Sequence, residues 1–450
     1  MSGAVHLPLD LPELDVAVAG GARLRRTVLP SGVRILSEAV PGAQSATAGF
    51  WVAVGSRDEQ PITYGSTHFL EHLLFKGTGE RSALDIASAF DAVGGEHNAL
   101  TAKEHTCYYA KVRDRDLPLA VEILADMFTS SVLDAEEFES ERGVILEELA
   151  MADDDPADVV GERFFEAVFG EHPLGRPIGG YPATIQAVGR DAVLGHYREN
   201  YRPQDLVVTV AGAVDHDALV ALVESALARA GWDPRADGAP VPRRDAAAPL
   251  LAAGSSPRVV ERPNEQVALM LGVPALRAGD ERRATLSVLN SVLGGGMSSR
   301  LFQEVREKRG LAYSVYSFAS AYSDAGLMGL SAGCSPRNAG RVAELMWSEF
   351  LRLADGGITP DELARAQGQL GGASALALED SDARMSRLGR AELTLGEFVD
   401  LDETVARVGA VTVEHVTALA HELVAGPLSV AAVGAVDAAD LGGLGGAAAA

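Results

Sequence analysis

LVVTVAGAVDHDAL, residues 206–219, returns in similar form as LSVAAVGAVDAADL, residues 428–441. Both stretches contain Gly-Ala-Val-Asp, at 212–215 and at 434–437, so the copies lie 222 residues apart, close to half of the 450-residue chain. Each copy reads as a β-rich run, a glycine turn and an aspartate placed to cap a following helix. The spacing and the matching surroundings favour an internal duplication, although chance could supply four small residues in an alanine-rich chain.

Chain length and the segment between the two copies predict the domain organisation. A chain of 450 residues is too long for one ordinary hydrophobic core, so we expect two or more domains. Residues 233–257 hold five prolines with alanines and mixed charges, a composition typical of an exposed linker. We therefore predict a first domain over residues 1–232, this linker, and a second, homologous domain over residues 258–450. The tail LGGLGGAAAA, residues 441–450, is expected to fray.

The pattern of apolar residues in the first half predicts strands followed by helices. Strands are expected at 24–29, 33–39, 48–54, 96–102 and 106–112, and helices from about residue 66, from residue 82, and over 117–128 and 135–151. Ser82 and Asp85 predict a capping box at the start of the second helix. This order indicates an α+β fold, with an antiparallel-rich sheet packed with helices in each half, and not a doubly wound α/β fold.

Composition restricts the class of protein and its partners. The chain is 47% apolar and 22% charged, as globular proteins are, and its net charge of −25 argues against a nucleic-acid partner. We find neither a secretory signal nor a run of apolar residues that could span a membrane. Cys107 and Cys334 form no disulfide framework and suit a reducing compartment, so a cytoplasmic protein is expected. Whether the acidic charge selects basic peptides stays open.

The segment STHFLEHLLFKGT, residues 66–78, carries the residues of a metal site. His68 and His72 are four positions apart, so on a helix both imidazoles lie on one face and can reach one ion. Glu71 lies close to the same face, where its carboxylate can act as a general base. The order H-x-x-E-H inverts the H-E-x-x-H motif of zinc peptidases. The alternative is an amphipathic helix with two surface histidines.

A catalytic zinc site needs a third protein ligand, and a later helix supplies candidates. The stretch ESERGVILEEL, residues 139–149, contains Glu141, Glu147 and Glu148. Seven residues make nearly two helical turns, so Glu141 and Glu148 share a face from which Glu147 points away. That face could offer one metal ligand and one carboxylate that holds an imidazole N–H. A solvated acidic helix face would show the same pattern.

Together these motifs resemble the pitrilysin superfamily, the inverted-motif zinc peptidases. The matching segments are HFLEHLLFKGT (68–78), GGEHNALTAKEHTCYYAKV (94–112), ERGVILEE (141–148), HPLGRPIGG (172–180) and YRPQDLVVTVAGAVD (201–215). The resemblance covers nearly the whole chain and is strongest to the β subunit of mitochondrial processing peptidase and its bacterial homologues.

The resemblance implies the roles of the metal-site residues. His68, His72 and Glu148 would ligate one Zn²⁺ per chain, Glu71 would be the general base, and Glu141 would be the supporting carboxylate. A shift of 222 residues places Asn290, Leu293 and Gly294 at the positions of His68, Glu71 and His72. These residue types cannot rebuild the site, so the second half is expected to hold no metal.

The resemblance also implies a strand that binds substrate. Asn98, Ala99, Leu100 and Thr101 match a segment with which an extended peptide pairs through backbone hydrogen bonds. The residues alone favour an ordinary internal strand instead.

Two further residues match positions in the half of relatives that faces the zinc. They are Arg306 and Tyr313, in LFQEVREKRGLAYSVYSF, residues 301–318. Tyrosine can donate a hydrogen bond to a developing oxyanion, and arginine can hold a carbonyl or carboxylate of the substrate. Both residue types are also commonplace on an exposed helix and at the start of a strand.

The expected function is that of a zinc metalloendopeptidase that hydrolyses unfolded peptides or presequence-like segments within a closed chamber. Relatives enclose the site between two double-domain units, and this chain has one such unit with both the metal half and the Arg/Tyr half. A homodimer is therefore the simplest assembly, and a heterodimer with a related subunit stays open. The alternative function is a non-catalytic peptide-binding or scaffold subunit of such a heterodimer, although such subunits usually lose the ligands or the base.

Overall fold

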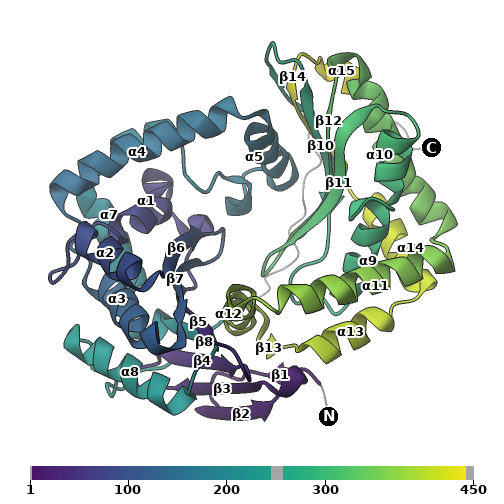
Figure 1. Cartoon of the computed structure of the whole chain (residues 1–450). Helices are drawn as coiled ribbons and strands as arrows, with labels where there is room; N and C mark the ends of the chain where they lie inside the picture. The colour runs from purple at the N-terminus through teal and green to yellow at the C-terminus, as the bar shows by residue number, and fades with distance from the viewer. Residues whose placement is uncertain (1–2, 245–256, 442–450) are drawn as a thin grey trace. The chain divides into compact units, whose positions relative to one another are not determined.

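The computed structural model describes residues 3–244 and 257–441, which belong to two compact units (Figure 1). Unit 1 comprises Met1–Leu149, Pro177–Arg244 and Ala375–Glu403, and unit 2 comprises Ala150–Arg176, Asp245–Ser374 and Thr404–Ala450. Each unit therefore combines most of one half of the chain with a short segment of the other half. The predicted domains, 1–232 and 258–450, are continuous in sequence, whereas the compact units are not. Two segments are exchanged between them: Ala150–Arg176 belongs to unit 2, and Ala375–Glu403 belongs to unit 1.

Unit 1 is built on a seven-stranded sheet in the order β2-β3-β4-β8-β5-β7-β6. Its strands are β2 (Glu13–Ala17), β3 (Arg23–Val28), β4 (Arg34–Ala39), β5 (Ser45–Val52), β6 (Glu96–Thr101), β7 (Thr106–Arg113) and β8 (Val207–Gly212). Neighbouring strands are antiparallel except β4 and β8, which are parallel. A separate pair joins β1 (Val5–His6) to β13 (Glu397–Phe398).

Both faces of this sheet are covered, which explains why its central strands are apolar at successive positions and not only at alternate ones. On β8, Val208 and Val210 face the core that α3 (Leu117–Ser130) closes, whereas Val207 and Ala211 face α12 (Ser381–Arg390). The other helices of unit 1 are α1 (Ser66–Leu74), α2 (Ala83–Val93), most of α4 (Ala135–Asp154), α6 (Pro182–Ala187), α7 (Arg190–Asn200) and α8 (His216–Arg229). The predicted capping box at Ser82 and Asp85 is present.

Unit 2 repeats this design on a five-stranded sheet in the order β11-β12-β10-β14-β9. Its strands are β9 (Arg258–Glu261), β10 (Val267–Pro274), β11 (Ala312–Ala321), β12 (Gly326–Cys334) and β14 (Ser429–Gly434). Its helices are α5 (Pro156–Phe169), α9 (Arg283–Gly294), α10 (Ala339–Gly356), most of α11 (Pro360–Ala377), most of α13 (Leu401–Gly409), α14 (Val413–Val424) and α15 (Ala438–Leu441). One face packs against α10 and α14, and the other packs against α5.

The 222-residue shift seen in the sequence holds in the structure. It carries β5 (Ser45–Val52) onto β10 (Val267–Pro274) and β8 (Val207–Gly212) onto β14 (Ser429–Gly434), residue for residue. The same shift makes α5 and α12 corresponding helices of the two halves. Each half contributes this helix to the unit built mainly from the other half, because α5 belongs to unit 2 and α12 belongs to unit 1. The α+β class and the two homologous domains predicted from the sequence are confirmed.

The linker predicted at 233–257 is described as far as residue 244. These residues are largely exposed, as a linker should be, but they are bound to unit 1. The Gly238 N–H donates to the carbonyl of Pro30 at 2.9 Å, and the Val241 N–H donates to that of Gln204 at 3.0 Å. The rest of the linker, residues 245–256, and the predicted frayed tail beyond residue 441 lie outside the described residues.

Three arginines from separate segments of unit 1 converge on the buried carboxylate of Glu392. The distances from their guanidinium nitrogens to Glu392 oxygens are 3.3 Å for Arg26, 3.5 Å for Arg34 and 3.1 Å for Arg243. Arg243 also donates to the carbonyls of Glu392 and Leu7. One carboxylate thus ties β3, β4, the linker and the exchanged segment together.

Across the described ranges 3–244 and 257–441, no helix is both long and apolar enough to cross a bilayer.

Candidate active site

Helix α1 presents the H-x-x-E-H residues because its opposite face is apolar. Phe69, Leu70 and Leu73 are buried in the core of unit 1, which leaves His68, Glu71 and His72 partly exposed on the other side. The helix begins after Gly65, which has a positive φ of 94°.

The buried carboxylate of Glu59 holds the first turn of α1. It accepts hydrogen bonds from the N–H groups of Gly65 and Thr67, both at 2.7 Å. A negative charge at this end of a helix also complements the helix dipole.

Helix α4 is held against α1 by stacked aromatic rings. The rings of Phe69 on α1 and Phe138 on α4 lie 4.4 Å apart between centroids and almost parallel. The guanidinium of Arg142 lies 4.9 Å from the Phe138 ring centroid. Because Glu141 and Glu148 are seven residues apart, the same helix face brings both carboxylates to the histidines of α1.

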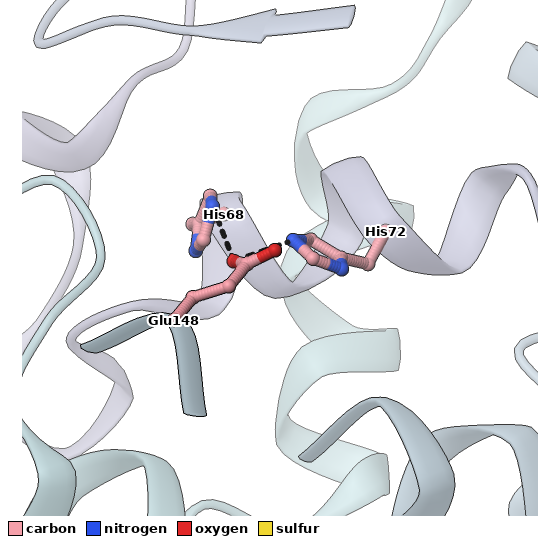
Figure 2. A group of neighbouring side chains, drawn as sticks. All are labelled: His68, His72 and Glu148. Atoms are coloured by element: carbon pink, nitrogen blue, oxygen red, sulfur yellow. Dashed lines mark ion pairs between the residues drawn. The ribbon is translucent and has the colours of Figure 1, made fainter. Parts of the chain in front are cut away.

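The nitrogens of His68 and His72 and a carboxylate oxygen of Glu148 converge on one point (Figure 2). The distance from Glu148 Oε2 to His72 Nε2 is 3.3 Å, and the distance to His68 Nε2 is 3.8 Å. A tetrahedral ion with bonds of about 2.0–2.1 Å would place its ligand atoms about 3.4 Å apart. Two imidazoles and one carboxylate in this arrangement fit a zinc ion. Within the described part of the chain, no other group of three histidine, cysteine or acidic side chains meets in this way.

The ring of His72 is oriented by Glu141. His72 Nδ1–H donates to Glu141 Oε2 at 2.9 Å, which turns Nε2 toward Glu148. The other carboxylate oxygen of Glu141 lies 2.6 Å from the ammonium of Lys76. Burial alone would raise the pKa of Glu141, but the hydrogen bonds from Lys76 and His72 outweigh it and lower the pKa below its usual value. Glu141 is therefore an ionised acceptor for the His72 N–H.

The side chain of His68 is 21% exposed. Its Nδ1 is buried, and a β-carbon on Gly179 would lie 3.7 Å from that atom and 2.9 Å from a methyl carbon of Leu149. Burial and then the neighbouring His72 lower the pKa of His68, while Glu71 and Glu148 oppose the shift. A neutral imidazole is the form that binds metal.

Glu71 lies on α1 one residue before His72 and is half-buried. Among the described residues, its carboxylate has no hydrogen bond or ion pair. It is therefore available to act on a molecule bound beside the three ligand atoms, as a general base requires.

Strand β6 carries Asn98, Ala99, Leu100 and Thr101 at the edge of the sheet, where, among the described strands, it pairs only with β7. The expectation of an internal strand, drawn from these residues alone, is wrong, because within residues 3–244 and 257–441 the strand order leaves one backbone edge of β6 without a neighbouring strand. The side chain of Leu100 is 51% exposed. Since β6 also packs against α1, this edge lies beside the helix of the two histidines.

Arg306 and Tyr313 are neighbours in unit 2. Arg306 lies in a short π-helix (Phe302–Glu307), and its guanidinium carbon is 4.7 Å from the ring centroids of both Phe302 and Tyr313. Tyr313 occupies an irregular position between Ala312 and Ser314 on β11, an edge strand of its sheet, and is 78% exposed. The metal ligands belong to unit 1, so the structure does not join the two groups within one unit.

The second half has no room for a matching site on α9. A β-carbon on Gly294, which stands where His72 stands in the first half, would lie 2.3 Å from the backbone nitrogen of Ser317. Any side chain there would collide with β11. The prediction that Asn290, Leu293 and Gly294 cannot rebuild the site agrees with this packing.

Three residues of the site region had no role in the sequence interpretation, namely Glu59, Lys76 and Gly179. Lys76 and Gly179 stand inside the motifs HFLEHLLFKGT and HPLGRPIGG. Their place inside these motifs was a signal, but only the fold shows which atoms they meet.

Comparison with known families matches both halves of the chain. Residues 34–181 match the family described as insulinase (peptidase family M16), and residues 187–370 match the family described as peptidase M16 inactive domain. The second match includes Gly294, which stands at the position of His72 after the 222-residue shift.

Similar proteins extend over most of the chain. Three of them are named uncharacterized zinc proteases. The protein from Streptomyces coelicolor is 49% identical over 92% of this chain and 90% of its own length, and that from Mycobacterium tuberculosis is 46% identical over 91% and 93%. The protein from Bacillus subtilis is 39% identical over 89% of this chain and 95% of its own length.

Two solved structures share the fold. A protease from Helicobacter pylori superimposes with a TM-score of 0.83 at 22% identity, over 92% of this chain and 99% of its own. A peptidase M16 inactive domain from Pseudomonas fluorescens superimposes with a TM-score of 0.80 at 20% identity, over 94% and 98%.

Proposed function

The chain belongs to peptidase family M16, within the pitrilysin superfamily, and on that premise we propose that it is a zinc-dependent endopeptidase. The observation that carries the proposal is the meeting of His68, His72 and Glu148, with the half-buried Glu71 on the same helix as the histidines. Relatives named zinc proteases support the choice of metal.

One Zn²⁺ would be held by His68 Nε2, His72 Nε2 and a carboxylate oxygen of Glu148. When bound, zinc supplies Lewis-acid polarisation of a carbonyl and lowers the pKa of a water molecule. Glu148 is the most exposed of the three, at 45% of its side chain. The ligands therefore leave one side accessible, as a catalytic site with an open fourth position requires.

Glu71 provides the acid–base chemistry. Its carboxylate takes a proton from water as the water oxygen bonds to the scissile carbonyl carbon. It then passes that proton to the peptide nitrogen as the carbon–nitrogen bond breaks. The net reaction adds one water molecule and yields a carboxylic acid and an amine, and the second proton of the water passes from the acid to the amine, so that a carboxylate and an ammonium group leave. Glu141 keeps His72 in place throughout by accepting its Nδ1–H.

The edge of β6 would hold the substrate in an extended conformation. Backbone N–H and C=O groups along Asn98–Thr101 can pair with a peptide and give affinity with little sequence preference. An extended strand is available in unfolded peptides and presequence-like segments, which are the substrate class proposed here.

We place Arg306 and Tyr313 in the same reaction, where tyrosine would donate to the developing oxyanion and arginine would hold a substrate carbonyl or carboxylate. A homodimer, in which one copy supplies these residues to the zinc site of the other within a closed chamber, is the simplest assembly. A heterodimer with a related subunit would serve as well. Size-exclusion chromatography with light scattering tests this part, because a fully active monomer would contradict it.

Hydrolysis of a quenched fluorescent peptide by the purified chain tests the proposed function. Wild type should cleave the peptide, whereas Glu71→Gln should bind zinc normally and lose at least about a hundredfold in turnover, the contribution typical of a general base. Glu147→Gln is the matched control, since Glu147 is an exposed glutamate on α4, and it should keep wild-type activity. Zinc binding without hydrolysis by wild type would instead favour a non-catalytic peptide-binding or scaffold subunit.

A further inference from the structure

Lys76 lies two residues beyond the end of α1 and reaches the support of the metal site. Its backbone N–H donates to the carbonyl of Leu73 at 3.1 Å, so the turn that carries it is fixed to the helix. Its ammonium lies 2.6 Å from Oε1 of Glu141, while Oε2 of the same carboxylate lies 2.9 Å from His72 Nδ1. The three side chains thus form a continuous chain from the turn after α1 to a metal ligand.

The carboxylate in the middle of this chain depends on both of its partners. The side chain of Glu141 is 4% exposed, whereas that of Lys76 is 31% exposed. With both oxygens engaged, the carboxylate plane cannot rotate about its terminal bond, so the acceptor for His72 stays in one place. Without Lys76 one oxygen would be left in a poorly hydrated position, which favours rotation of the group or displacement toward water.

We propose that Lys76 is a positioning residue that holds Glu141 so that His72 presents Nε2 to the metal. This proposal rests on the zinc site proposed above. The partners of metal-ligating imidazoles affect metal affinity because they fix the orientation of the ring. An ordinary surface ion pair would contribute little to stability and nothing to the metal affinity. A measurement of zinc affinity therefore distinguishes a positioning residue from a lysine that only forms a surface ion pair.

The test is the zinc dissociation constant of the full chain, measured at neutral pH by competition with a chromophoric chelator. Lys76→Met should weaken zinc binding about tenfold, the lower end of the effect expected when support of a ligand is lost. Lys76→Arg keeps a cationic donor and should recover most of the affinity. Lys111→Met is the matched control, since Lys111 belongs to the same unit, is 29% exposed and pairs with Asp380 at 2.8 Å. It should bind zinc as wild type does.

A double variant shows whether Lys76 acts through Glu141. Glu141→Gln should weaken zinc binding on its own, and adding Lys76→Met to it should cause no further loss, because the two changes interrupt the same chain. Equal zinc affinities of wild type and Lys76→Met, or full additivity in the double variant, would overturn the positioning role and leave the zinc site intact. Absence of zinc binding in wild type would instead overturn the proposed function itself.

Discussion

His72 Nδ1 lies 2.9 Å from a carboxylate oxygen of Glu141, a residue 69 positions further along the chain. This contact joins α1 to α4 beside the point where His68, His72 and Glu148 meet. It fixes which nitrogen of His72 carries the proton, and so which nitrogen is free to bind a metal. The arrangement of the site therefore depends on the packing of two helices as well as on the motif within one of them.

Replacement of Glu148 should remove a zinc ligand. Glu148→Gln exchanges a carboxylate that lies 3.3 Å from His72 Nε2 for a neutral amide. We expect zinc affinity to fall by more than the tenfold to hundredfold typical of changes in groups that only support ligands. Equilibrium dialysis against buffered zinc measures the effect. Glu147→Gln, at the preceding position, should bind zinc as wild type does, and equal losses in both variants would contradict the assignment.

Glu392→Gln should destabilise unit 1. The change would leave the buried guanidinium groups of Arg26 and Arg34, and the partly buried one of Arg243, without their shared counter-charge. Removal of one partner from a buried ion pair costs about 3–5 kcal/mol. Urea unfolding followed by circular dichroism checks this, with Glu379→Gln, an exposed position, as the control. A variant as stable as wild type would show that the four charges are not coupled.

The metal-free protein should gain stability as pH rises from 4 toward 6.5. Burial, and then Arg25, lower the pKa of His216 from 6.5 to about 4. Burial, and then Arg390, lower that of His105 to the same value. In this window the unfolded chain binds protons that the folded chain does not, so acid favours unfolding. For His216 the difference is worth up to about 3 kcal/mol.

Thermal unfolding midpoints at several pH values, in the presence of a chelator, measure this dependence. His216→Asn should flatten the curve, whereas His6→Asn, which changes an exposed histidine, should not. A midpoint for wild type that does not change across the window would rule out buried neutral histidines.

Local sequence patterns predict where the helices and strands of this fold lie, but not which of them pack against each other. The 222-residue shift, the capping box at Ser82 and the seven-residue spacing of Glu141 and Glu148 all follow from local patterns, and the structure shows each of them. The exchange of α5 and α12 does not follow from such patterns. An amphipathic helix reveals which of its faces is apolar but not which of two similar sheets it covers.

Polar contacts between residues far apart in the sequence could not be predicted from local patterns either. Arg243 stands in a proline-rich stretch that reads as an exposed linker, and nothing near it indicates that it reaches Glu392. The edge position of β6 depends on the order of all the strands, so Asn98–Thr101 alone could not show it. Lys76 looks like an ordinary surface lysine until Glu141 is placed beside it.

The most direct test of the zinc site is an anomalous difference map from crystals of the zinc-loaded protein, recorded at the zinc absorption edge. We expect one peak per chain, at about 2.0–2.2 Å from His68 Nε2, His72 Nε2 and an oxygen of Glu148. A map with no peak at these atoms, or with its peak in the second half of the chain, would contradict it.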